Sequence, residues 1–138
     1  MIKKIFFAAM LLSTTYVHAS DAVIDVPALV GKSKSQVSGL IGQPTSCSSS
    51  KYGEKCQYEK AETEIVFINK KADWITVEGL DDKPFSDSTI TFLGFKPQKP
   101  SFSNAFTMKW EPLQGLRSVS IYKGGANSDY AYIKAYTK

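Results

Sequence analysis

One short pattern occurs twice in this chain, 52 residues apart, and it constrains the fold more than any other feature. In each copy an apolar pair followed by glycine ends a helical stretch, at residues 40–42 (LIG) and 92–94 (FLG). An aromatic residue followed by glutamate ends a strand-like run at the same offset, at residues 58–59 and 110–111. The repeat predicts one helix-plus-strands unit that is used twice, an arrangement suited to a scaffold that presents a sheet.

The elements of the first unit are predicted from capping and strand patterns. A helix is expected over residues 33–41, because Ser33 and Gln36 can form a capping box and Gly42 can end the helix. Residues 20–30, which precede it, are expected to form an extended arm or a first strand. A strand is expected at residues 55–59, and runs of β-branched and aromatic residues predict a hairpin of two further strands at residues 64–69 and 72–78.

The second unit repeats this order. Its helix is expected over residues 86–93, although three consecutive β-branched residues, at positions 89–91, weaken the helical pattern. Its strands are expected at residues 105–111, 116–123 and 130–136. All strand connections within a unit are short, so the strands are expected to pair antiparallel.

These elements predict an α+β fold. Two similar halves, about residues 24–82 and 83–138, can join into one antiparallel sheet with two helices on one face. We predict that residues 20–138 form a single domain of this kind. The opposite face of the sheet would then be open to solvent or to a partner.

The N-terminus, residues 1–19, is predicted to be a secretory signal peptide. Lys3 and Lys4 precede an apolar run at residues 5–12, and the residues before position 20 suit cleavage after Ala19. The alternative is a membrane anchor, but the apolar run is too short to span a bilayer. No other segment is apolar enough to span a membrane. We therefore expect a mature protein without a membrane anchor, located in the periplasm or secreted.

The charge pattern argues against a nucleic-acid partner. Removal of the leader takes away two lysines and lowers the net charge from +4 to +2. Lysine is abundant, whereas Arg117 is the single arginine. Sequence-specific nucleic-acid readers rely on the bidentate contacts of arginine, and scattered lysines are typical of a solvated surface.

Two cysteines, Cys47 and Cys56, remain in the mature chain. An even number of cysteines in an exported protein predicts a disulfide. The alternative is a redox-active pair, but such pairs are usually separated by two residues, whereas eight intervene here. Two cysteines without a histidine are too few ligands for a metal site. No metal and no cofactor are expected.

The residue inventory fits catalysis poorly. The only histidine, His18, is removed with the leader, and a cysteine in a disulfide is no nucleophile. A hydrolase based on the carboxylates of Asp81, Asp82 and Asp87 remains an alternative, although such residues are typical of a solvated turn. A Ser–Lys dyad also stays open, but no serine lies in a recognisable nucleophile turn. We therefore predict a protein that is not an enzyme.

Aromatic residues make a binding function the better prediction. In the last expected strand, tyrosines and one lysine alternate onto one face, and two tryptophans lie in strands of the two halves. Tyrosine supplies large, stiff and amphipathic contact area, which suits interfaces. The alternative is that the tyrosines cover the second face of the sheet with their hydroxyls in water, and that the tryptophans are core residues. The candidate partner-binding residues are Trp74, Trp110, Tyr130, Tyr132, Lys134 and Tyr136.

Residues 31–44 (GKSKSQVSGLIGQP) carry a resemblance to a known fold group. The segment resembles the opening of the β-lactamase-inhibitor-like and outer-membrane assembly lipoprotein E-like (SmpA/OmlA) group, in which such a helix precedes an antiparallel hairpin. The tandem order is similar to the inhibitor branch, where two halves build one sheet whose concave face grips a partner protein. The resemblance implies an exported bacterial member of this group. The lipid-modified cysteine of the assembly lipoproteins is absent after the leader, so their anchor is not implied.

We therefore predict a soluble exported protein that engages another protein through its aromatic sheet face. Its role would be that of an inhibitor or of an accessory factor in the cell envelope. The alternative is a glycan-binding module of the envelope, because exposed aromatic rings also stack on sugars. The spread of the tyrosines along a strand favours a broad, flat contact over a pocket.

Overall fold

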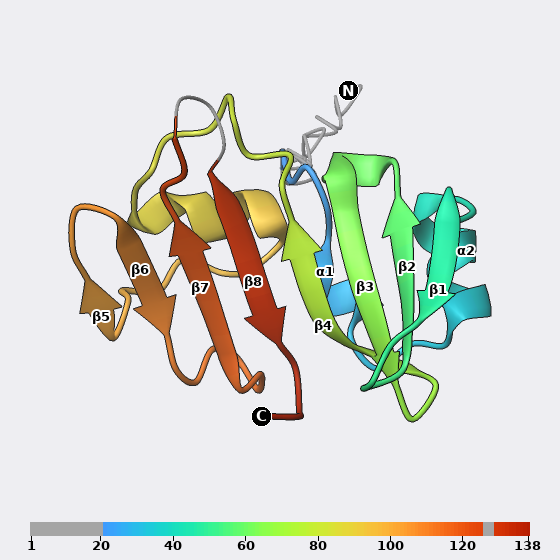
Figure 1. The fold of residues 1–138 in the computed structure, drawn as a ribbon. Coiled ribbons are helices and arrows are strands. Elements are labelled where there is room, and N and C mark those ends of the chain that lie inside the picture. Colours follow the sequence, from blue (N-terminus) through green and yellow to red (C-terminus); the bar gives the residue numbers. More distant parts are fainter. Residues whose placement is uncertain (1–20, 126–128) are drawn as a thin grey trace, which may run out of the picture.

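A single antiparallel sheet organises the chain in the computed structural model, which describes residues 21–125 and 129–138 (Figure 1). The strand order is β1-β2-β3-β4-β8-β7-β6-β5, which places β4 beside β8 in the middle. The strands are β1 (Ser46–Ser49), β2 (Glu54–Tyr58), β3 (Thr63–Ile68), β4 (Lys71–Val77), β5 (Phe102–Ser103), β6 (Thr107–Trp110), β7 (Ser118–Tyr122) and β8 (Tyr130–Lys134). The predicted leader, residues 1–19 with His18, lies outside the described residues.

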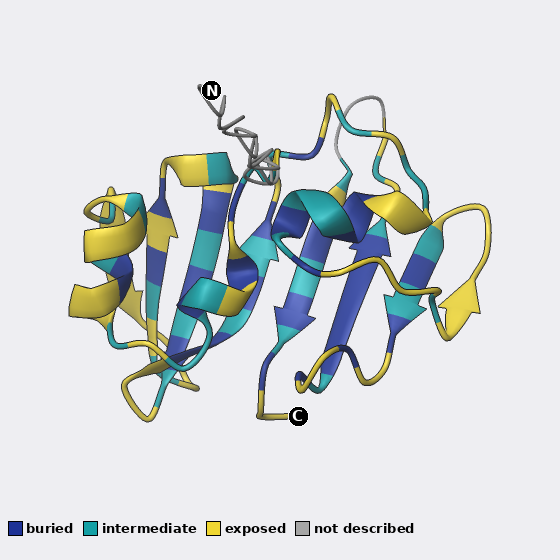
Figure 2. Cartoon of the chain, turned by 180° about the vertical axis from the view of Figure 1, so that it is seen from behind, coloured by how far each residue is buried: buried dark blue, intermediate teal, exposed yellow. Residues whose placement is uncertain are grey.

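Three helical segments lie on one face of this sheet, α1 (Val26–Leu29), α2 (Lys34–Ile41) and the 3₁₀ segment η2 (Asp87–Leu93). A short 3₁₀ segment, η1 (Lys60–Glu62), connects β2 to β3 at the end of these strands. Seen from behind, α1, α2 and η2 lie in front of the strands, and buried residues line the surface between the layers (Figure 2). The predicted α+β class with one antiparallel sheet is confirmed. Among the described helices, none has the length and apolar character needed to cross a bilayer.

Helix α2 forms as the sequence predicts. The Ser33 hydroxyl accepts a hydrogen bond from the Gln36 amide at 3.2 Å, and the Gln36 side chain accepts one from the Ser33 amide at 2.9 Å. Gly42 follows with a φ of 96°, a conformation that glycine adopts without strain. Of the helix side chains, Val37 is fully buried against the sheet. The capping box therefore sets where the helix begins, and Val37, together with the partly buried Ile41, packs the helix against the core.

The second expected helix is a 3₁₀ segment, η2, rather than an α-helix. The Thr89 hydroxyl accepts a hydrogen bond from the Ser86 amide at 3.1 Å and donates one to the carbonyl of Pro84. β-Branched side chains crowd the preceding turn of a helix, and threonine hydroxyls compete for backbone groups. These local bonds hold the tighter turn, and Gly94, with a φ of 87°, ends it.

Three further expectations at the edges are wrong. The sequence predicts no strand at residues 46–49 or 102–103, but these residues form β1 and β5, so the sheet has eight strands rather than the six expected. Residues 20–30 were expected to be extended, yet Asp25 caps a short helix there by accepting from the Ala28 amide at 3.3 Å. Short polar edge strands carry almost no hydrophobic pattern, which is why periodicity does not reveal them.

The two predicted hairpins are confirmed. β3 and β4 pair antiparallel across a tight turn in which Asn69 and Lys70 both have positive φ, 52° and 64°. β7 pairs with β8 in register from Ser118↔Lys134 to Tyr122↔Tyr130. The last strand then pairs with β4, so both hairpins meet at the middle of the sheet.

The predicted disulfide joins Cys47 of β1 to Cys56 of β2. The two residues are direct partners in the strand register, and Cys56 is fully buried on the helix side. β1 lies at the edge of the sheet, and its four residues are all exposed. The covalent link therefore holds an edge strand that buries little apolar surface of its own.

Reduction of this disulfide is expected to lower the free energy of unfolding by about 2–3 kcal/mol, because the link closes a short loop in the unfolded chain. Urea unfolding with and without a reductant measures the difference. A thiol assay on the denatured, unreduced protein should detect no free thiol. Two free thiols, or identical unfolding curves, would contradict this account.

Candidate protein-binding face

The strand register divides the side chains between two faces. Ile65, Ile75 and Ile133 lie opposite one another in β3, β4 and β8, and all three are fully buried toward the helices. Successive side chains of a strand point to opposite faces. The neighbouring residues Trp74 and Lys134, which are also direct partners, therefore point to the other face. No helix among the described residues covers this second face, which we call the open face (Figures 1 and 2).

An aromatic cluster lies on the open face around Trp74. The ring of Tyr52, from the β1–β2 loop, meets the Trp74 ring edge-on, with 4.7 Å between ring centroids. The Lys134 Nζ lies 5.7 Å from the centroid of Trp74 and 5.7 Å from that of Tyr132. The Lys51 Nζ lies 5.2 Å from the centroid of the Tyr52 ring. Both lysines are thus within the range of cation–π attraction to rings of the cluster.

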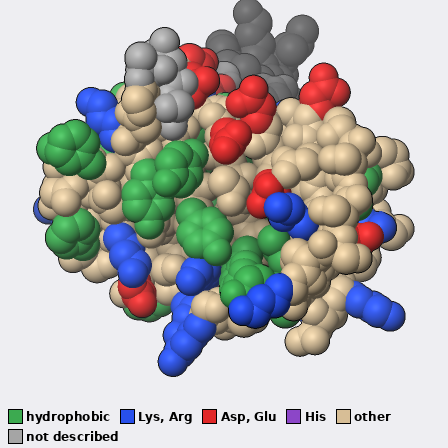
Figure 3. Space-filling view, viewed as in Figure 1, with side chains coloured by type: hydrophobic (Ala, Val, Ile, Leu, Met, Phe, Trp, Pro, Cys, Tyr) green, Lys and Arg blue, Asp and Glu red, His purple; other side chains and the backbone are tan. Residues whose placement is uncertain are grey.

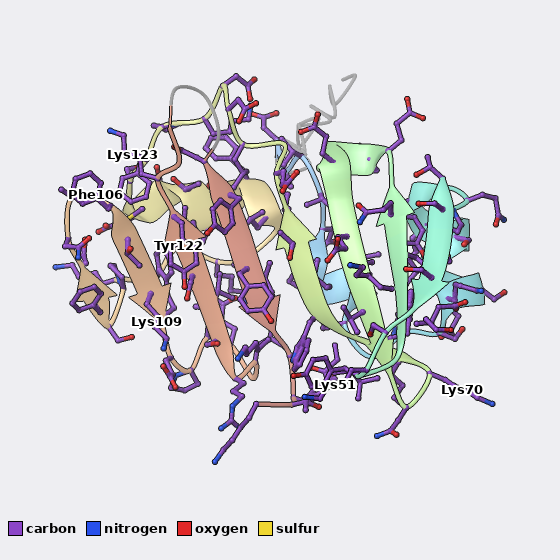
Figure 4. All side chains as sticks on the ribbon, in the orientation of Figure 1. Lys51, Lys70, Phe106, Lys109, Tyr122 and Lys123 are labelled. Atoms are coloured by element: carbon purple, nitrogen blue, oxygen red, sulfur yellow. A yellow bond between two sulfur atoms is a disulfide. The ribbon has the colours of Figure 1, made fainter. Side chains whose placement is uncertain are left out.

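A stacked tyrosine pair continues this cluster. Tyr122 and Tyr130 are direct partners in β7 and β8, and their rings stack with centroids 5.1 Å apart. Tyr132 is two residues from Tyr130 on the same strand face. Hydrophobic side chains form a band across the front of the molecule in Figure 3, and Figure 4 shows Tyr122 within it. We call this set the aromatic band: Tyr52, Trp74, Tyr122, Tyr130 and Tyr132.

Small buried residues support the band. Ser120 lies between Tyr132 of β8 and Lys109 of β6, and Ser118 is the partner of Lys134. Both serines are nearly inaccessible, with 5% and 9% of their surface exposed. These small residues are thus the strand partners of Tyr132 and Lys134 on the open face.

Two predicted site residues lie elsewhere. Trp110 is fully buried on the helix side, and its Nε1 donates to the Gln98 carbonyl at 2.8 Å. Tyr136 follows the end of β8 and lines a recess with Pro27 and Phe95, on the side of the helices. The prediction that Tyr136 shares a face with Tyr130 is wrong, because strand alternation ends at Lys134. Trp110 is a core residue, which agrees with the alternative interpretation of the sequence.

A carboxylate that the sequence analysis missed, that of Asp73, anchors the C-terminus beside the band. Its Oδ1 accepts hydrogen bonds from the amides of Tyr136 and Thr137 at 3.0 and 3.1 Å, and its Oδ2 accepts from the Thr137 hydroxyl at 2.6 Å. The Thr137 carbonyl in turn accepts from the Trp74 Nε1 at 3.1 Å. Asp73 is only 3% exposed, next to a register shift in the β3–β4 pair. The sequence signal that could have indicated this role is the presence of an aspartate inside an otherwise apolar strand.

Replacement of this carboxylate, Asp73→Ala, is expected to lower the free energy of unfolding by about 1–3 kcal/mol, because three donors lose a charged acceptor. Hydrogen exchange should show faster exchange of the amides of Tyr136 and Thr137. Urea unfolding measures the change in stability. Unaltered stability with unaltered exchange would show that the C-terminal segment is held by other contacts.

On and beside the open face, the pKa values of two groups are shifted, one mainly by burial and one mainly by a charged neighbour. Burial raises the pKa of the Tyr132 hydroxyl above its ordinary value, and the neighbouring Tyr122 and Asp73 add to the increase. At the edge of the face, the Lys109 ammonium donates to Glu111 at 2.6 Å, which lowers the pKa of the Glu111 carboxyl. Like an ordinary tyrosine, Tyr132 is protonated at neutral pH, so its hydroxyl can donate a hydrogen bond to a partner.

Because the folded state holds the Tyr132 proton more tightly than the unfolded chain does, this group contributes stability that is present below about pH 10 and lost as the pH rises further. The tyrosine absorbance of the parent protein and of Tyr132→Phe is measured as the pH is raised. In the variant, one of the tyrosines that ionise at the highest pH should be missing from the titration curve. Loss of an early-ionising tyrosine instead would contradict the burial of this hydroxyl.

The other candidate groups do not form a site. Asp81, Asp82 and Asp87 are exposed, and Asp82 lies 3.5 Å from the Lys83 ammonium. Within the described part of the chain, one group has the spacing of metal ligands, namely Cys47, Glu54 and Cys56. Its two sulfurs are bonded to each other, so they are not free to bind an ion. Among the groups described, the aromatic band is therefore the candidate functional site.

Comparison with known proteins found no matching family model and no significantly similar curated protein or solved structure.

Proposed function

We propose that the chain is an exported, non-catalytic protein that binds another protein through the aromatic band. The observation that carries the proposal is that five aromatic residues adjoin two lysines on a face that no described helix covers, and that neither lysine forms an ion pair with another described residue. Aromatic residues are enriched at protein interfaces, and a contiguous exposed apolar patch typically marks an interaction site. Of the predicted residues, Trp74, Tyr130, Tyr132 and Lys134 belong to this surface, and Tyr52 and Tyr122 extend it.

Export is supported by two independent features. The leader pattern of residues 1–19 is that of a secretory signal, and a disulfide joins Cys47 to Cys56. Disulfides persist in oxidising compartments such as the periplasm and the extracellular space. We propose that the mature protein acts in one of these compartments, without a membrane anchor.

The tandem halves and the family resemblance belong to the same proposal. Each half supplies four consecutive strands, and the last strands of the two halves, β4 and β8, pair antiparallel at the centre. This order supports a doubled unit, as in the inhibitor branch of the β-lactamase-inhibitor-like group that residues 31–44 resemble. On this reading the protein acts as an inhibitor or as an accessory factor of the cell envelope.

The test compares a variant of the half-buried Tyr132 with a variant of the buried Trp110, in binding and in stability. Tyr132→Ala is expected to weaken partner binding at least about tenfold, since tyrosines dominate many interfaces, while the free energy of unfolding falls by about 1 kcal/mol or less. Trp110→Ala should lower stability by about 3–5 kcal/mol, because it leaves a cavity in the core. Capture of envelope and secreted proteins on the immobilised full chain supplies the partner, and unfolding curves supply stability.

The outcomes separate binding from packing. A protein retained by the parent chain and lost from Tyr132→Ala supports the proposal. If Tyr132→Ala destabilises the fold as much as Trp110→Ala does, the band is a packing feature and the proposal fails. If the captured proteins are the same on both baits, the binding face lies elsewhere.

A glycan is the second candidate, because the Trp74 ring is only partly buried and could stack on a sugar. Trp110 is fully buried, so a change in tryptophan fluorescence on adding an envelope glycan would report on Trp74. The change should vanish in Trp74→Phe. A saturable response of this kind without any protein capture would favour the glycan over the protein partner.

A further inference from the structure

We propose that the partner presents an acidic segment to the aromatic band, and that Lys134 and Lys51 receive its carboxylates. This inference rests on the proposed function and adds the chemistry of the partner. Both ammonium groups lie over aromatic rings, and neither has a carboxylate partner among the described residues. Lys109 on the same face differs, since it is already paired with Glu111 at 2.6 Å.

The position of Lys134 makes its charge available to a partner. Its side chain is half-buried between Trp74 and Tyr132, with 5.7 Å from Nζ to each ring centroid. Partial burial removes water from a cation, and ring faces compensate for that loss only in part. A carboxylate supplied from outside would complete its contacts. A charge pair in a water-poor interface contributes more than one exposed to solvent.

The carboxylates near this lysine already have partners. Asp73 accepts from the C-terminal backbone, Glu111 accepts from Lys109, and Glu64 accepts from the side chain of Gln57. Among the described residues none of these carboxylates forms an ion pair with Lys134, although Lys134 helps to lower the pKa of the Glu111 carboxyl. The Lys134 ammonium can therefore make a direct contact with a carboxylate of the partner.

The distribution of charge on the open face agrees with this. In Figure 3, basic side chains gather at the lower end of the hydrophobic band, whereas most acidic side chains lie toward its upper edge. Figure 4 places Lys51 and Lys109 at that lower end, and Arg117 precedes β7 there. The pKa of the Glu111 carboxyl is lowered first by Lys109, and Arg117 and Lys134 add to the effect. Lys109, Arg117 and Lys134 therefore act on the same carboxylate at this end of the band.

The shape of the surface favours a segment of protein over a small anion. Four recesses in the described part of the chain lie at the start of α2, on either side of η2 and beside Tyr136, and residues of the aromatic band line none of these four. Small-molecule sites are concave and enclose most of their ligand. A flat row of rings with cations along one end fits acidic side chains carried on an extended or helical segment.

The test selects random twelve-residue peptides, displayed on phage, on the purified full chain, with the double variant Trp74→Ala/Tyr132→Ala as the negative bait. Some peptides should bind the parent chain but not the double variant. We expect these peptides to contain at least twice as much Asp and Glu as the unselected library. Synthetic copies of them should bind Lys134→Gln at least tenfold more weakly than the parent chain. Lys99→Gln, which removes an exposed charge on the helix side, should change the dissociation constant less than twofold. Thermal unfolding verifies that each variant is folded.

Each other outcome contradicts a defined part of the argument. Peptides that need Trp74 and Tyr132 but show no acidic excess, and bind Lys134→Gln normally, overturn the inference and leave the proposed function standing. A failure to select any peptide that depends on the aromatic residues counts against the proposed function itself. Binding of polygalacturonate through Lys134, without acidic peptides, would assign the lysines to an acidic glycan. Dimerisation of the chain that the aromatic double variant abolishes would place a second copy on the face.

Discussion

The antiparallel pairing of β4 with β8 is the interaction on which the rest of the structure depends. It joins the first four strands to the last four, and without it the sheet would be two separate ribbons. On the helix side the pair contributes Ile75 and Ile133 to the core. On the open side the same pair brings Trp74 opposite Lys134. Core and candidate binding surface therefore share one backbone register, and a slip of one residue would exchange them.

The two faces of the sheet are stabilised in different ways. The helix side buries aliphatic side chains, whereas the open side carries rings and lysines that tolerate water at their tips. Asp73 connects the two sides, because it is buried at the end of the central pair and fixes the C-terminal segment against the Trp74 ring. The band is thus held by contacts that do not require a partner, which keeps it preorganised for one.

The parts of the fold that the sequence predicts are those with strong local signals. The capping box at Ser33 and the β-branched hairpins are of this kind, and both are confirmed. The edge strands β1 and β5 lack an apolar pattern, and the threonine-rich η2 depends on hydroxyl bonds to backbone that periodicity does not show. An aspartate within the β4 segment is a local signal that Asp73 is unusual, but its hydrogen-bond donors lie more than sixty positions away, so the sequence pattern does not identify them.

The positions of the two tryptophans show why a strand pattern alone does not define a surface. In the repeat, Trp110 matches Tyr58 rather than Trp74, and Tyr58 and Trp110 are both buried on the helix side. Trp74 lies one residue out of phase with the buried Ile75, which directs its ring to the open face. A single step along a strand therefore separates a core residue from a contact residue. The same step places Lys134 beside Ile133, so the cation between the rings follows directly from the packing of the central pair.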